Sequence, residues 1–157
     1  MVDLIDYIKP NGSWIVNLIK SPDNKVFHSS SKWLSDEWYL KETDFKYGGN
    51  VYEFGRGAFS NINLLKEEFG YKEISQLNNF EGVIDFFSFL DPDLVVELLM
   101  KLDFQKTSIK YACIAFKPVQ EVELEKNKKN LLSLMSEEFD FVKQKRTELL
   151  FINKNLK

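Results

Sequence analysis

The stretch FEGVIDFFSFLDPDLVVELLMKLDF, residues 80–104, decides the fold because it is far more apolar than the segments that flank it. Its first half, residues 81–90, places apolar side chains at the i, i+3, i+4 and i+7 spacing of an amphipathic helix. Asp91 and Pro92 then supply an N-cap and a first helical residue for a second helix with a broad leucine-rich face. The pattern predicts two apolar helices at the centre of the core.

Charged side chains interrupt this run too often for a membrane span, so we expect no association with a membrane. The interrupting residues are Glu81, Asp85, Asp91, Asp93, Glu97 and Lys101. The N-terminal sequence MVDLIDYIKP carries acids where a signal peptide carries bases, and it lacks a continuous apolar segment. A single cysteine, Cys113, excludes an internal disulfide framework and fits a reducing compartment. A cytoplasmic location is therefore expected.

The segments around the central run predict a mixture of helices and strands. Helices are expected at residues 2–8, 32–40, 61–69 and 121–136, and strands at residues 14–20, 25–28, 51–54, 108–116, 138–142 and 147–152. The chain has 157 residues and 44% apolar content, which suits one globular domain over residues 1–157. The expected fold is α+β, with the central helix pair packed on a small, mainly antiparallel sheet.

Two glycines, Gly55 and Gly57, belong to the most suggestive short motif. The sequence GRGAFSNI, residues 55–62, resembles the glycine-rich loop of protein kinases, in which backbone amides approach nucleotide phosphates. Ser60 stands where the third glycine is usual, and the sequence has no VAIK-like lysine and no HRD or DFG equivalent. We therefore interpret the glycines as a tight turn or a bulge.

The sequence has too few residues of the types that carry out catalysis or bind metals to predict an active site or a metal site. His28 is the one histidine of the sequence, and Cys113 lies on a predicted buried strand. Asp91 and Asp93 lack the glycine and the terminal glutamate of an EF-hand loop. We expect no catalytic residue, no metal ligand and no cofactor, and we do not expect an enzyme.

The charge is unevenly distributed, although the net charge is only −3. Residues 73–103 hold seven acids and one base, whereas residues 126–157 hold eight bases and four acids. Segregation of this kind can steer association with a charged partner, and solvated faces that differ in sign are the alternative. The bases alternate with acids and no reader motif accompanies them, so we expect no nucleic acid partner.

In size, single-cysteine usage, acidity and its Lys-, Asn-, Phe- and Ile-rich composition, the chain resembles the small cytoplasmic immunity proteins of bacterial toxin systems. The resemblance implies a monomer or weak homodimer whose acidic surface neutralises a basic toxin, such as a nuclease. Acids and aromatic anchors would form the partner-binding surface: Glu81, Asp85, Asp91, Asp93, Glu97, Trp33, Trp38 and Tyr39. For the aromatic residues, packing in the core is the alternative interpretation.

Two other functions remain open. A small enzyme or ligand-binding protein would assemble its site from residues distant in sequence, and its candidates are Arg56, Ser60, His28 and Tyr111. A self-associating structural or phage-accessory protein would pair through the exposed edge of the C-terminal hairpin.

Overall fold

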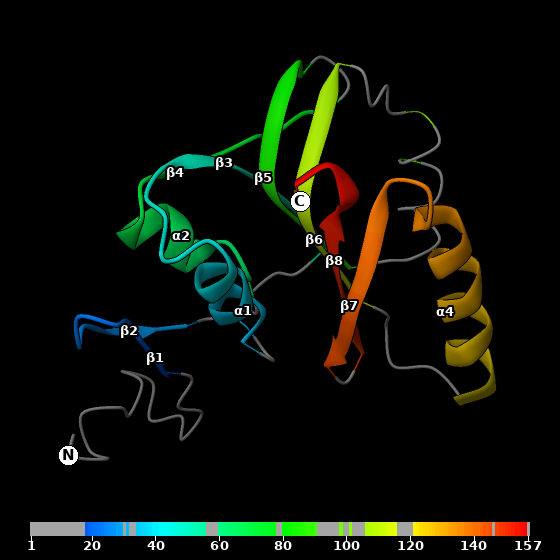
Figure 1. Ribbon diagram of the computed structural model, residues 1–157, viewed down its shortest axis with the longest axis horizontal. Helices are drawn as coiled ribbons and strands as arrows, with labels where there is room; N and C mark the ends of the chain where they lie inside the picture. Colours follow the sequence, from blue (N-terminus) through cyan, green and yellow to red (C-terminus); the bar gives the residue numbers. More distant parts are fainter. Residues whose placement is uncertain are drawn as a thin grey trace.

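The computed structural model describes residues 18–29, 31, 34–55, 60–77, 80–90, 98, 101, 106–115, 121–145 and 147–156. In chain order its elements are β1 (Leu18–Lys20), β2 (Val26–His28), α1 (Ser35–Glu42), β3 (Gly49–Phe54), α2 (Asn63–Glu68), β4 (Tyr71–Glu73), β5 (Gly82–Leu90), β6 (Thr107–Ala115), α4 (Glu121–Met135), β7 (Phe139–Lys145), β8 (Glu148–Asn153) and the 3₁₀ helix η2 (Lys154–Leu156). Strands β1 and β2 form a hairpin. The other six form a mixed sheet with the order β4-β3-β5-β6-β8-β7 (Figure 1).

The prediction of a central helix pair is wrong, because its first arm is strand β5 and not a helix. Side chains from Ile84 to Phe89 are buried on both faces of the sheet. A strand covered on both faces is a nearly continuous apolar run, and over nine residues such a run also matches helical spacing. Aromatic and β-branched side chains then favour the strand. Residues 91–97, which would begin the second arm, lie outside the described residues.

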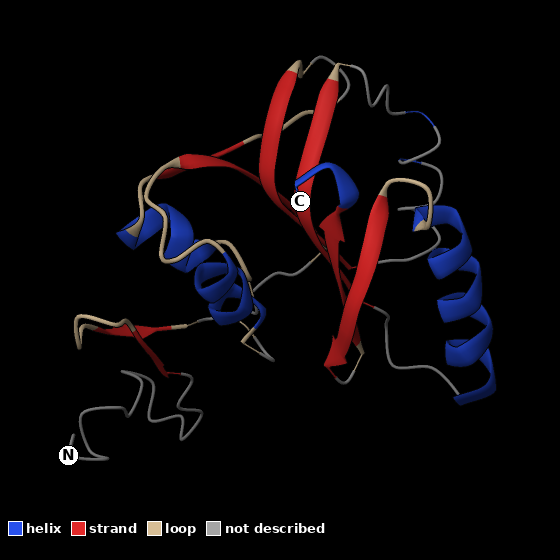
Figure 2. Cartoon of the chain, viewed as in Figure 1, coloured by secondary structure: helices blue, strands red, loops and turns tan. Residues whose placement is uncertain are grey.

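The prediction of a mainly antiparallel sheet is also wrong. Strands β4, β3, β5 and β6 are parallel to one another, and only β8 runs against its neighbours β6 and β7. The cause is the way in which the strands are connected: parallel strands need a crossover over one face of the sheet, and helices α2 and α4 lie in two of these crossovers. The sheet therefore has helices on both faces (Figure 2).

The direction in which the chain crosses the sheet reverses after β4. Helix α2 leads from β3 to β4 and packs on one face of the sheet through Leu64 and Leu65. The next connection contacts the opposite face through Ile74, Leu77 and Phe80 and brings the chain to β5, on the other side of β3. Right-handed crossovers that run in opposite directions must lie on opposite faces. The position between the carboxyl ends of β3 and β5 is therefore a topological switch point.

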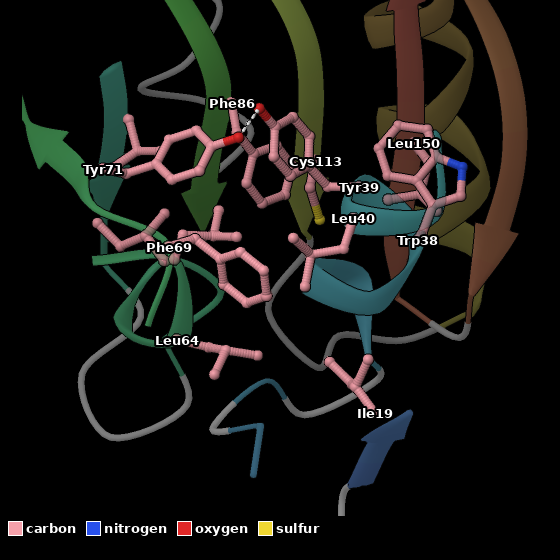
Figure 3. Packing of buried hydrophobic residues seen from close by; sticks show 13 residues of the cluster. Ile19, Trp38, Tyr39, Leu40, Leu64, Phe69, Tyr71, Phe86, Cys113 and Leu150 are labelled. Carbon is pink, nitrogen blue, oxygen red and sulfur yellow. Dashed lines mark hydrogen bonds between the residues drawn. The ribbon is translucent and has the colours of Figure 1, made fainter. Parts of the chain in front are cut away.

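Two buried clusters form the core, one on each face of the sheet. The first lies under α4 and contains Leu131 and Met135 together with Phe87 and Phe89 of β5. The second lies under α1, α2 and the β1–β2 hairpin, and Figure 3 shows its aromatic and leucine side chains packed together. Burial of each such large apolar side chain contributes about 1.5–3 kcal/mol before chain entropy is subtracted.

Several predictions outside the central run are confirmed. The predicted interior strand at residues 108–116 is β6, the helix at residues 121–136 is α4, and the C-terminal hairpin is β7 with β8. The helices predicted at residues 32–40 and 61–69 correspond to α1 and α2, and the strand at residues 51–54 belongs to β3. The helix predicted at residues 2–8 lies outside the described residues.

Candidate functional site

The carboxyl ends of β3 and β5 meet at Gly55. The parallel register pairs Phe54 with Phe89, one residue before the turn. Gly55 has a φ of 82°, and a Cβ atom built there would lie 2.6 Å from the carbonyl oxygen of Leu90. Only glycine tolerates both this dihedral angle and this approach to the neighbouring strand. The turn therefore leaves the exposed backbone of Gly55 at the switch point.

A buried polar network centred on Asn61 lies directly behind this turn. The Nδ2 atom of Asn61 is 3.1 Å from Oγ of Ser88 and 3.3 Å from Oε1 of Glu148, and its Oδ1 atom accepts from the Ser31 hydroxyl. Asn61, Ser88 and Ser31 are all completely buried. Because buried polar groups are costly without partners, this network holds the chain after β3 in one place against β5.

Glu148 joins the network from the first residue of β8. Its side chain is 1% exposed. Oε2 accepts from the Ser35 hydroxyl at 3.0 Å, and Oε1 accepts from the Cys113 thiol at 3.4 Å. One carboxylate of β8 thus contacts α1, the segment before α2 and β6, which are distant from one another in the sequence.

Backbone amides at the start of α2 already have acceptors within the protein. Oγ of Ser60 accepts from the N–H groups of Ile62 and Asn63, each at 3.1 Å. Oε2 of Glu53 accepts from the N–H group of Asn61 at 2.7 Å. These amides occupy the place where dinucleotide-binding folds offer N–H groups to a pyrophosphate. Since they are occupied and face a carboxylate, a phosphate is disfavoured there.

Asp36 is a second buried carboxyl group on this side of the sheet. It lies in the first turn of α1, has no exposed surface and accepts from the Ser29 hydroxyl. Burial raises the pKa of Asp36 to about 7, and the hydrogen bond from Ser29 offsets part of that rise. The group therefore changes its charge near neutral pH.

A different cluster forms around Asp85, toward the amino ends of the parallel strands. Oδ1 of Asp85 lies 3.0 Å from Nζ of Lys46 and 3.8 Å from Nζ of Lys110, and Oδ2 accepts from the N–H group of Asn50 at 2.8 Å. Gly49, with a φ of 151°, makes room for this carboxylate, because a Cβ atom there would lie 2.5 Å from Oδ2. The cluster opens onto a cavity of about 200 Å³.

Two tyrosines lie beside this cavity and share a hydrogen bond. The hydroxyls of Tyr39 and Tyr71 are 2.8 Å apart and point toward each other in Figure 3, and Tyr71 donates to the backbone oxygen of Lys46. Burial raises the pKa of Tyr71 to about 12 and raises that of Tyr39 further. Both hydroxyls therefore stay protonated at neutral pH, as hydrogen-bonding groups and not as bases.

The acids predicted to bind a partner do not share one surface among the described residues. Glu81 is exposed, 3.9 Å from Nζ of Lys106, whereas Asp85 is buried beneath its lysines. The other three lie outside the described residues: Asp91, Asp93 and Glu97. The partner-binding role of this set stays a prediction.

The predicted aromatic anchors are found in the core where they are described. Trp38 is 5% exposed and Tyr39 is completely buried, and both rings pack against Phe86 and Tyr111. These positions match the alternative interpretation, packing in the core. Trp33 lies outside the described residues.

The candidates for a site assembled from distant residues are spread over the molecule. His28 is exposed on β2, Ser60 is buried at the start of α2, and Tyr111 is half-buried on β6 beside the Asp85 cavity. Burial raises the pKa of Tyr111. Arg56 lies outside the described residues. Among the described candidates, Ser60 lies in the connection between β3 and α2.

The network around Asn61 was not predicted from the sequence. Its members come from five segments and have no regular spacing, so no motif connects them. One signal was present: Ser88 and Cys113 each interrupt an apolar strand that is covered on both faces, where a polar side chain needs an internal partner.

No cluster of three or more metal-ligating side chains occurs among the described residues. Within the same part of the chain, no helix is both long and apolar enough to cross a membrane. No protein-family model matches the chain, and no curated protein matches it.

Proposed function

We propose that the chain binds a nucleoside-containing ligand at the switch point between β3 and β5. The observation that carries the proposal is that the chain leaves β3 for β4 and then returns past β3 to β5, with α2 on one face of the sheet and the following connection on the other. In open sheets with parallel strands, ligands bind outside the carboxyl ends of the strands at the point where the winding reverses. This support comes from architecture, and the local side chains narrow the ligand class.

Gly55 and Phe54 supply features that suit a nucleoside. The absent side chain of Gly55 lets the turn pass against the Leu90 oxygen of β5, and the Gly55 backbone is exposed there to a ligand. Phe54 is 42% exposed, and its ring stacks on Phe89 with 4.8 Å between centroids. An exposed ring fixed by a second ring offers a flat surface for a base, and base stacking contributes about 1–3 kcal/mol.

Glu73, the last residue of β4, is placed to accept from the hydroxyls of a ribose. It follows Gly55 by 18 residues on the neighbouring strand, close to the spacing of about 20 at which dinucleotide-binding folds carry such an acid. Its carboxylate is 2.6 Å from Nζ of Lys66, with both side chains partly exposed. Pairs of this kind contribute at most about 1 kcal/mol, so a ribose diol can compete for the carboxylate.

The charge around the turn selects against phosphate-rich ligands. Ser60 and Glu53 occupy the amide groups that would otherwise bind a pyrophosphate, and Glu53 adds a negative charge. A neutral or positively charged nucleoside fits better than ATP or NAD. Adenosine and S-adenosylmethionine, which carry no phosphate, represent that class.

The test is thermal unfolding of the full chain with adenosine, S-adenosylmethionine, ATP or NAD. A ligand present at about 100 times its Kd adds about 2.7 kcal/mol to the free energy of unfolding. We expect stabilisation by the two phosphate-free ligands and weaker stabilisation by ATP and NAD. No stabilisation by any of the four at millimolar concentration would contradict the proposal.

Two glycines provide a matched pair of variants. Gly55→Ala introduces a Cβ atom 2.6 Å from the Leu90 oxygen, whereas a Cβ atom at Gly70, which has a similar φ of 70°, would meet no atom within 4 Å. Both alanines cost backbone energy, and only Gly55→Ala should abolish binding. Glu73→Gln, at an exposed position, should weaken the binding of ribose-containing ligands without loss of the fold.

Binding of a basic protein partner is the second candidate function. Glu81 and Val83 are both exposed at the start of β5, and together they present a carboxylate beside an apolar side chain. Capture of one stoichiometric basic protein that salt releases, and that Glu81→Lys no longer binds, would favour this candidate.

A further inference from the structure

A cavity of about 200 Å³ lies at the opposite end of the parallel strands, where β3 and β4 begin. The turn of the β1–β2 hairpin forms one wall, and the loop between α1 and β3 forms another. Four of the residues that line it are aromatic: Phe27, Phe45, Tyr47 and Phe69. None of them belongs to the switch point.

Phe69 forms the base of this cavity, and the other three rings surround it. Its side chain is 1% exposed. The ring centroids of Phe27 and Tyr47 each lie 4.9 Å from that of Phe69, and the Phe45 centroid lies 6.3 Å away, with tilts between 42° and 50°. Tyr47 is 62% exposed, so one wall is open to solvent. A cation that sits over the face of an aromatic ring, within about 6 Å of its centroid, is attracted by the ring, and four rings line this cavity.

The charged residues that line the cavity also favour a positively charged ligand. Asp23 and Asp44 contribute carboxylates, and Lys25 is the only base of the described lining. Nζ of Lys25 is 3.9 Å from Asp23, so part of its charge is already balanced. The Ser21 hydroxyl donates to Asp23 and lowers the pKa of that carboxyl group, which keeps it ionised. An anion has little to bind here.

The loop after α1 holds an unusual conformation that places two of these residues together. Asp44 and Phe45 have φ values of 53° and 55°, in the left-handed region that residues with side chains rarely adopt. The N–H group of Phe45 donates to the Leu40 oxygen at 2.6 Å, and that of Gly48 donates to the Phe69 oxygen at 2.7 Å. Such strain persists where surrounding contacts enforce it, and it concentrates at ligand sites.

We propose that this cavity binds an alkylated ammonium group, of the kind found in choline and in trimethyllysine. The rings solvate the methyl groups and attract the positive charge, and Asp23 and Asp44 complement that charge at the rim. A bare metal ion fits less well, because the described residues hold no cluster of three metal-ligating side chains. The site is separate from the switch point, and its test does not depend on the nucleoside proposal.

The experiment titrates the full chain with choline and with tetramethylammonium and follows backbone amide resonances by NMR. We expect the Gly48 and Phe69 amides to shift in a saturable way. The neutral analogue 3,3-dimethylbutan-1-ol has the shape of choline with carbon in place of nitrogen, and it should bind at least about tenfold more weakly. Equal binding of the neutral analogue, or no shift with choline at high millimolar concentration, would overturn the proposal.

Variants at exposed positions keep the fold and probe the two interactions separately. Asp44→Asn retains a residue that tolerates the left-handed conformation and removes one charge, and Tyr47→Ala removes one ring. Each substitution should weaken the binding of choline about three- to tenfold. Glu137→Gln and Phe141→Ala, at exposed positions beyond α4, are the matched controls and should leave the affinity unchanged. Unchanged affinity in both test variants would overturn the proposal.

Discussion

The two ends of the parallel strands satisfy a buried carboxylate in different ways. Near the carboxyl edge, Glu148 accepts from uncharged side chains that are buried with it, among them Ser35 and Asn61. Near the amino edge, Asp85 is buried beneath Lys46 and Lys110, whose side chains remain 44% and 34% exposed. A buried donor that loses its acceptor has no access to water, whereas a lysine at the surface can turn outward. The two carboxylates should therefore differ in what their removal costs.

The largest expected effect comes from Glu148→Leu. It removes the acceptor of the Ser35 hydroxyl and one of the acceptors of the Asn61 amide from a buried network, and we expect a loss of about 3–5 kcal/mol in the free energy of unfolding. Asp85→Asn keeps an acceptor for the Asn50 N–H group and frees two lysines that water can solvate, so it should cost only about 1–2 kcal/mol. Urea denaturation measures both. Equal losses would show that exposure of the partners does not decide the cost.

Asp36 adds a pH dependence to the region near the carboxyl edge. Its folded-state pKa of about 7 lies above its ordinary value of 3.8, so the folded chain binds more protons than the unfolded chain between those values. The contribution of Asp36 is fully present below pH 4 and is lost as the pH rises through 7, by at most about 4 kcal/mol. Asp36→Asn should remove this decline. Unfolding midpoints from pH 4 to pH 8 provide the measurement.

The comparison is between the parent and Asp36→Asn, because their difference isolates the contribution of Asp36. Glu137→Gln is the matched control, because Glu137 is exposed after α4. Its stability profile should run parallel to that of the parent. A decline of the same size in Asp36→Asn would assign the pH dependence to other groups.

The elements that could be predicted from the sequence are those whose faces differ in polarity, or whose ends are marked by turn residues. The helix α4 and the hairpin β7–β8 are examples, because a charged helix face and the polar residues between two β-like runs are local signals, although Gln144 and Lys145 themselves belong to β7. The same reasoning failed for β5, where burial on both faces removes the alternation that distinguishes a strand from a helix. The parallel order of the strands also depends on crossovers that no local pattern specifies.

The candidate site shows the same limit. Gly55 stood out in the sequence because glycine spacing is local, but its contact with Leu90 depends on the pairing of β3 with β5. Asn61 and Glu148 are 87 residues apart and meet only in the folded sheet. The turn at Gly55 can thus be predicted from the sequence, whereas the network that positions this turn depends on the topology of the sheet.

The smallest expected effect is the loss of stability in Lys46→Gln, and its dependence on salt distinguishes the two ends of the parallel strands. Lys46→Gln weakens an ion pair in which the lysine is 44% exposed, so we expect a loss below about 1 kcal/mol at low salt, which 1 M salt largely removes. Ser88→Ala removes an uncharged buried partner of Asn61 and should cost about 1 kcal/mol at either salt concentration. Lys25→Gln, whose ion pair with Asp23 is exposed on both sides, is the control and should have no measurable effect. If salt changed the effects of Lys46→Gln and Ser88→Ala equally, charge would not distinguish the two ends, because screening acts only on the charged pair.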